Sequence, residues 1–168
     1  TESALLLWLQ GQGADYRSLR SDNAVADRLP FSTERKYMAT VAAVNDAEWL
    51  FVKGAPEVVM GFCDISNEEA EAVRKQLRLW QDKAMRTLAF ACRRADTLSV
   101  EHLTLQAVVG ISDPIREDVP NAVADCRSAG IGVKIVTGDT SATAIEIARQ
   151  IGAWDDHTPA EAQITGPD

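Results

Sequence analysis

The chain has 168 residues, of which 46% are hydrophobic and 25% charged, an ordinary composition for a soluble globular protein. Its formal net charge of -8 argues against a polyanion-binding surface, because nucleic-acid binding depends on clustered lysines and arginines. Residues 1–112 hold 15 acids and 13 bases (net -2), and residues 113–168 hold 10 acids and 4 bases (net -6). We therefore expect no nucleic-acid partner, and a divalent cation would be favoured near the more acidic second part.

The cysteines and the apolar runs indicate the cellular compartment in which the chain is expected. Cys63, Cys92 and Cys126 show no metal-ligand spacing, which favours reduced thiols in the cytosol over a zinc site or a disulfide framework. No run approaches eighteen consecutive apolar residues. The start at Thr1, with neither Met nor a signal-peptide pattern, predicts that the chain is a piece of a longer protein.

The first fifty residues predict a helix and a hairpin. Apolar side chains recur at helical spacing over 2–10, and Gly11 follows as a stop signal. Residues 15–30 read as a polar connection with weak helical stretches. Two antiparallel strands are predicted within 36–53, joined at the turn signal Asn45-Asp46.

The next sixty residues predict helices and strands that do not strictly alternate. Pro56 fits the first turn of a short helix, where its missing N–H costs nothing. Ser66 precedes an acid-rich turn and an apolar stripe, which predicts a helix over 67–84. Strands are expected at 87–93 and 105–111. The order indicates an α+β domain in which helices flank an antiparallel sheet.

After residue 112 the pattern changes to one typical of α/β proteins. A helix is predicted over 117–129 with Gly130 at its end, then a continuous apolar strand over 131–136 and a helix over 141–151. This order indicates an incomplete Rossmann-like segment, too short to complete its own sheet. We therefore divide the chain into domains at 1–112 and 113–168.

Two groups before residue 60 carry candidate chemistry. Lys53 at a strand end can reach into a cleft, and Gly54 would let a base or a phosphate approach the backbone; the alternative is a commonplace strand-to-helix turn. Phe31 offers a ring for a purine to stack on, and Arg35 and Lys36 offer cations for phosphates. By residue pattern alone, a core position is the favoured interpretation of Phe31.

Two loops at the carboxyl ends of predicted strands carry further candidates. Asp113 and Arg116 follow one strand, and Thr137, Gly138 and Asp139 follow the next. Ligands of parallel α/β sheets collect at such strand ends, so both loops are expected at one site. A hydroxyl, a close-approach glycine and a carboxylate at a helix N-terminus suit a transferring phosphoryl group, although alone the tripeptide is merely a loop.

Four blocks, in this order, resemble the cytosolic catalytic portion of P-type cation-transporting ATPases. They are FSTERKYM at 31–38, KGAPE at 53–57, DPIR at 113–116 and TGD at 137–139. TESAL at 1–5 is similar to the family's T-E-x-A-L helix start. Thr33 departs from the reticulum-type calcium pumps, which have a phosphate-contacting arginine there, and looks like the plasma-membrane subgroup.

The resemblance implies roles for particular residues. Phe31 would stack on adenine, and Glu2 would accept from the adenine amino group. The remaining nucleotide contacts it implies are Lys36, Lys53, Gly54, Arg86, Asp113 and Arg116. Thr137, Gly138 and Asp139 would support the phosphoryl site, with ATP and Mg²⁺ as cofactors of the whole enzyme.

The resemblance also implies what the chain belongs to. It would be the nucleotide-binding domain and part of the haloacid-dehalogenase-like phosphorylation domain of a calcium pump, cytoplasmic in an integral membrane protein. Its partners would be ATP or ADP and the remaining phosphorylation, actuator and transmembrane domains. The D-K-T-G-T and G-D-G-x-N-D blocks are absent, so the chain alone is expected to bind nucleotide without forming an aspartyl phosphate.

Several alternatives stay open. The chain could be the cap and partial core of a soluble haloacid-dehalogenase-like phosphatase, part of a sodium/potassium, magnesium or proton pump, or a regulatory fragment. We assign no metal ligands, because His102 and His157 have no partners at ligand spacing and Asp155-Asp156 reads as a solvated turn. An unpaired parallel edge in 113–168 would favour disorder or non-physiological self-association.

Overall fold

The structure is a computed structural model that describes residues 2–83, 85–112, 114–137 and 141–164. The chain divides into two compact units. The first contains the residues up to Arg78 together with Arg86–Ile111, and the second contains Leu79–Met85 and the residues from Ser112 onward.

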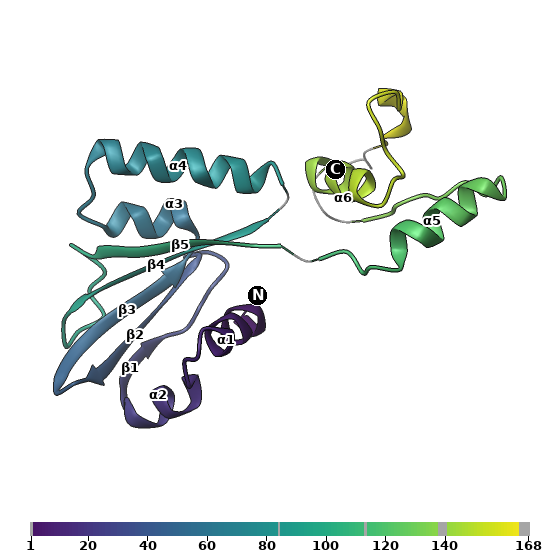
Figure 1. Cartoon of the computed structure of the whole chain (residues 1–168). Coiled ribbons are helices and arrows are strands. Elements are labelled where there is room, and N and C mark those ends of the chain that lie inside the picture. Colours follow the sequence, from purple (N-terminus) through teal and green to yellow (C-terminus); the bar gives the residue numbers. More distant parts are fainter. Residues whose placement is uncertain (1, 84, 113, 138–140, 165–168) are drawn as a thin grey trace. The chain divides into compact units, whose positions relative to one another are not determined.

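A five-stranded antiparallel sheet, with its strands in chain order, forms the first unit (Figure 1). Burial alternates along the second half of the third strand, because successive side chains point to opposite faces. On the third strand, Leu50 and Val52 are 0% and 2% exposed, whereas Phe51 between them is 41% exposed. The strands are β1 (Val25–Leu29), β2 (Tyr37–Val44), β3 (Ala47–Gly54), β4 (Arg86–Arg94) and β5 (Thr104–Ile111).

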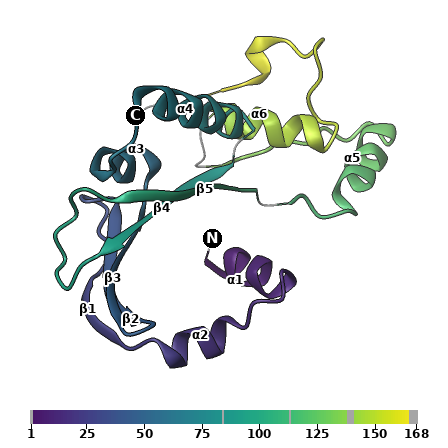
Figure 2. The ribbon, with the colours of Figure 1, turned by 60° about the vertical axis from the view of Figure 1, so that its left-hand side comes forward.

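Helices lie on both faces of this sheet. Two of them, α3 and α4, lie over one face, and α1 lies on the opposite side (Figures 1 and 2). The core forms where α3 meets the sheet, and it includes Val41, Leu50, Val52, Val59 and Leu103. The helices are α1 (Glu2–Gly11), α2 (Tyr16–Asp22), α3 (Pro56–Val59) and α4 (Asn67–Gln81), with a 3₁₀ turn, η1 (Met60–Phe62), after α3.

Local sequence signals account for most of the first unit. The hairpin turns at Asn45 and Asp46, whose φ angles of 49° and 59° are the left-handed values that a tight hairpin turn of this twist requires. Pro56 opens α3 as predicted. Ser66 and Glu69 cap α4 reciprocally, each accepting a hydrogen bond from the backbone of the other. The predicted α+β fold with an antiparallel sheet is therefore confirmed.

The connection predicted over residues 15–30 is more ordered than expected. Asp15 caps α2 by accepting hydrogen bonds from the amides of Arg17 and Ser18 at 3.0 and 3.2 Å. The strand β1 then pairs with β2 and was not predicted, because four of its five residues are exposed and leave no alternating apolar pattern. As an edge strand it is held through its backbone on one side only.

The second unit contains the two predicted helices but not the predicted strand. The helices are α5 (Val119–Ser128) and α6 (Ser141–Gln150), followed by a 3₁₀ turn, η2 (Ala160–Ala162). Gly130, with φ +76°, follows the end of α5 as predicted. Residues 131–136 form no strand, which corrects that prediction, and Val136 is 96% exposed.

The missing strand has a physical reason. A strand needs a neighbour to take its backbone hydrogen bonds, and the described part of the second unit contains no strand to pair with. The Rossmann-like, haloacid-dehalogenase-like interpretation of 113–168 is therefore not confirmed. Among the described residues, no helix is both long enough and apolar enough to span a bilayer.

Candidate functional site

Strand pairing brings several predicted site residues to one end of the sheet. The register pairs Tyr37 with Gly54, and Gly54 with Ala89. The start of β2, the end of β3 and the start of β4 therefore lie at the same end. Lys36 directly precedes β2, and Arg86 is the first residue of β4. Lys36 and Lys53 are therefore close to this end of the sheet, and Arg86 lies three positions beyond Ala89, the residue that pairs with the end of β3.

An ion pair links Glu2 to Lys53. The Nζ of Lys53 donates a hydrogen bond to Oε1 of Glu2, which ties the first turn of α1 to the end of β3. The hydrogen bond from Lys53, together with its positive charge, lowers the pKa of Glu2 below its ordinary value of 4.5. The Lys53 side chain is 25% exposed and that of Glu2 73%, so Lys53 is the more enclosed partner. The site therefore presents a hydrogen-bond acceptor, the Glu2 carboxylate, beside a hydrogen-bond donor, the Lys53 ammonium group.

Gly54 is required by the packing of the two strands. A Cβ at this position would lie 2.5 Å from the carbonyl oxygen of Lys36 and 2.5 Å from Cβ of Tyr37. The amide of Ala55 donates to the same Lys36 oxygen at 2.9 Å. The structure thus gives Gly54 a role within the fold, and its predicted role in ligand approach stays a prediction.

The segment before β2 presents an aromatic ring to solvent. Phe31 is 57% exposed, so its alternative interpretation as a core residue is wrong. Lys36, at the other end of this segment, is exposed and has a φ of 59°. Left-handed backbone is uncommon for a residue with a side chain and marks positions that their surroundings hold in place.

The remaining described candidates, Arg116 and Thr137, belong to the second unit. Arg116 belongs to the second unit, where its guanidinium binds the carboxylate of Asp118 through Nε at 3.2 Å and Nη2 at 2.7 Å. Thr137 is also in the second unit and is exposed. Asp113, Gly138 and Asp139 lie outside the described residues.

Two aromatic residues on the same strand as Lys53 form a surface that was not predicted. Trp49 and Phe51 stack with ring centroids 6.5 Å apart, and the guanidinium of Arg94 lies 5.6 Å from the centroid of Trp49. They occupy alternate positions of β3 and therefore share a face with Lys53. The period-two spacing of Trp49, Phe51 and Lys53 is the signal that could have identified this surface.

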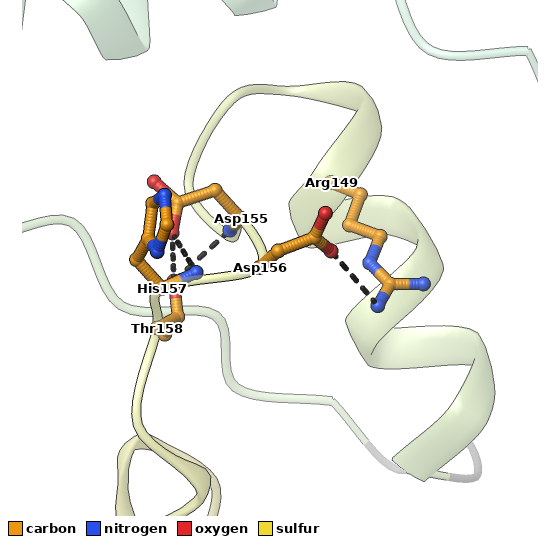
Figure 3. Close-up of polar contacts among 5 residues, drawn as sticks. All are labelled: Arg149, Asp155, Asp156, His157 and Thr158. Atoms are coloured by element: carbon orange, nitrogen blue, oxygen red, sulfur yellow. Dashed lines mark hydrogen bonds and ion pairs between the residues drawn. The ribbon is translucent and has the colours of Figure 1, made fainter.

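The Asp155-Asp156 pair forms a turn, as predicted. Oδ1 of Asp155 accepts hydrogen bonds from the His157 amide at 2.9 Å and from the Thr158 hydroxyl at 3.0 Å (Figure 3). These bonds, that of His157 first, lower the pKa of Asp155 below its ordinary value. Asp156 instead lies 4.0 Å from the guanidinium of Arg149. The Asp155 carboxylate therefore holds the turn, whereas the Asp156 carboxylate lies near Arg149.

The architecture and the polar residues at one end of the sheet define an α+β domain with a candidate site for a small anionic ligand. Residues 1–118 match the family model described as P-type ATPase, cytoplasmic domain N. The chain therefore belongs to the P-type ATPase family.

Relatives from distant organisms agree with this family. The chain is 35% identical to calcium-transporting ATPase PAT1 of Dictyostelium discoideum over 90% of its length. It is 31% identical to the plasma membrane-type calcium-transporting ATPase 9 of Arabidopsis thaliana over 95%, and 32% identical to calcium-transporting ATPase 1 of Lactococcus lactis over 90%. The chain spans only 15%, 17% and 19% of these relatives, respectively.

Proposed function

We propose that this chain is the ATP-binding portion of a P-type ATPase that couples ATP hydrolysis to cation transport, with calcium as the cation. Residues 1–112 would form the nucleotide-binding domain, and 113–168 would be part of the phosphorylation domain. Membership of the family supports ATP hydrolysis coupled to cation transport as the reaction, and the relatives named as calcium-transporting ATPases support calcium as the cation. They also favour a membrane pump over a soluble phosphatase.

The Glu2–Lys53 pair is the observation that carries nucleotide binding. Adenine presents a donor, its N6 amino group, next to an acceptor, its N1 atom. The carboxylate of Glu2 and the ammonium of Lys53 form an acceptor and a donor in contact, which matches that pattern. Phe31, which is exposed, offers the apolar face on which the ring would stack.

Cationic residues at the same end of the sheet would serve the phosphates. Lys36 and Arg86 are exposed; Lys36 precedes Tyr37, the partner of Gly54, and Arg86 begins the strand that pairs with β3. Phosphoryl transfer depends mainly on positioning and on neutralising charge, so this domain would deliver ATP to the phosphorylation site rather than react itself. Thr137, Gly138 and Asp139 would support the phosphoryl group in the assembled enzyme.

Mg²⁺ would accompany the nucleotide and neutralise the charge on its phosphates. Within the described ranges, no group of three or more His, Cys, Asp or Glu side chains is placed to hold a metal ion. We therefore assign no Mg²⁺ ligands to this part of the chain and derive no step through the ion.

Isothermal titration of the 168-residue chain with ATP tests the proposal. Lys53→Met should weaken binding by about 1.5–3 kcal/mol, roughly 10- to 150-fold, because a charge-assisted contact is lost. Lys75→Met, at an exposed position of α4, removes the same charge away from the site and should leave the affinity unchanged. No heat up to millimolar ATP would refute nucleotide binding, and equal affinities for Lys53→Met and the wild type would refute the role of Lys53.

A further inference from the structure

The segment that carries Phe31 is held by its own hydrogen bonds. Oγ of Ser32 accepts from the Arg35 amide at 3.1 Å, and the Ser32 carbonyl accepts from the Lys36 amide at 2.8 Å. The guanidinium of Arg35 turns back and donates to the Pro30 carbonyl at 2.9 Å. Pro30 and Ser32 are the two neighbours of Phe31, so these bonds bracket the aromatic residue on both sides.

The same segment is fixed to the end of β3. The Lys36 carbonyl accepts from the Ala55 amide at 2.9 Å, and Gly54 leaves the space that this approach needs. The left-handed backbone of Lys36 turns the chain from this segment into β2. The hydrogen bonds around Arg35 therefore act on a segment whose far end is anchored to the strand that carries Lys53.

We propose that Arg35 is a positioning residue: it orients Phe31 and Lys36 for the nucleotide and does not itself contact the phosphates. The proposal rests on the proposed function, because it assumes that Phe31 and Lys36 meet ATP. It revises the sequence interpretation, in which Arg35 was offered as a cation for phosphates. The observation that favours the positioning role is the bond from its guanidinium to Pro30, the residue directly before Phe31.

The first test needs no nucleotide, so it stays informative even if the chain does not bind ATP. Amide hydrogen exchange, followed by NMR, is compared between the wild type, Arg35→Gln and the charge-matched control Arg74→Gln. Arg74 lies on α4 and pairs with Glu71. Loss of the Pro30 bond should speed exchange at the Lys36 amide about threefold or more, with no change in the control. Unchanged exchange in Arg35→Gln would overturn the proposal.

The second test separates positioning from phosphate contact. Because Lys36 itself would serve the phosphates, the comparison is made in a Lys36→Met background. If Arg35 only positions its neighbours, Arg35→Gln in that background should lower the affinities for ATP and AMP by the same factor, about three- to tenfold. In that background, a loss that is larger for ATP than for AMP would show a direct phosphate contact and would overturn the proposal. No loss for either nucleotide would overturn it as well.

A second pair of variants guards against misfolding of Arg35→Gln. Ser32→Ala removes the hydroxyl that accepts from the Arg35 amide and, in the same Lys36→Met background, should reproduce the equal loss for ATP and AMP. Ser32→Thr keeps a hydroxyl at this position and should restore both affinities. Equal behaviour of the Ala and Thr variants would contradict an orienting role for this turn.

Discussion

Replacing Gly54 by alanine tests the close approach of β2 and β3. The added Cβ would lie 2.5 Å from the Lys36 carbonyl oxygen and 2.5 Å from Cβ of Tyr37. Carbon atoms in favourable contact are about 3.5–4.0 Å apart, so the two strands would have to separate by about 1 Å here. Neither neighbour is the mobile end of a side chain.

The expected loss of stability follows from what the separation disrupts. Forcing an extra methyl group into a packed position costs about 1–3 kcal/mol. The hydrogen bond from the Ala55 amide to Lys36 would also be weakened, which adds about 1 kcal/mol. Tyr37 cannot move freely, because its ring packs edge-on against Phe62 with centroids 5.2 Å apart. We therefore expect Gly54→Ala to lower the free energy of unfolding by about 2–4 kcal/mol.

Urea unfolding followed by circular dichroism measures this change. Gly61→Ala is the matched control, because a Cβ there meets nothing within 4 Å and its φ is not in the left-handed region. The control should be neutral or stabilising by up to about 1 kcal/mol. A Gly54→Ala protein as stable as the wild type would refute the packing role. If that stable variant also failed to bind ATP, Gly54 would be there for the ligand instead.

Two further predictions concern other contacts of the first unit. Ser66→Ala removes the cap of α4 and should lower the free energy of unfolding by about 1 kcal/mol in the same urea assay. If stability did not fall measurably, the hydrogen bond of 3.2 Å from the Glu69 amide to Oγ of Ser66 would not stabilise the helix. Because the folded pKa of Glu2 is lowered, the stability from its pairing with Lys53 is present above pH 4.5 and is lost as the pH falls through the lowered value. An NMR titration should find the Glu2 pKa below 4.5 in the wild type and returned toward it in Lys53→Met, and identical titrations would contradict the ion pair.

The parts of the fold that sequence could predict are those with a complete local signal. The hairpin at Asn45-Asp46 and the cap at Ser66 lie within a few residues of the structure they specify. The contact between Glu2 and Lys53 spans 51 positions, and no periodicity links the two residues. Only the family resemblance placed them at one site.

Two features of the site needed the structure, because one depends on the register of β2 and β3 and the other on the backbone conformation of the segment before β2. The sequence shows that Gly54 lacks a side chain, but only the pairing with Tyr37 shows what a side chain would strike. The sequence likewise shows a cation at Arg35, but only the fold of its segment shows the guanidinium turned back to Pro30. Charge and residue type predict what a group can do, whereas register and backbone conformation decide what it contacts.

Residues 131–136 show why a correct pattern can give a wrong element. Their continuous apolar run is typical of a strand that is covered on both faces and paired on both edges. The described part of the second unit does not cover this run, since Ile131 is 58% and Val136 is 96% exposed. It also contains no strand with which the run could pair. The helices α5 and α6 form on either side because their hydrogen bonds are internal to each segment. A helical period therefore predicts structure without reference to neighbours, whereas an apolar run predicts a strand only on the condition that a partner strand is present.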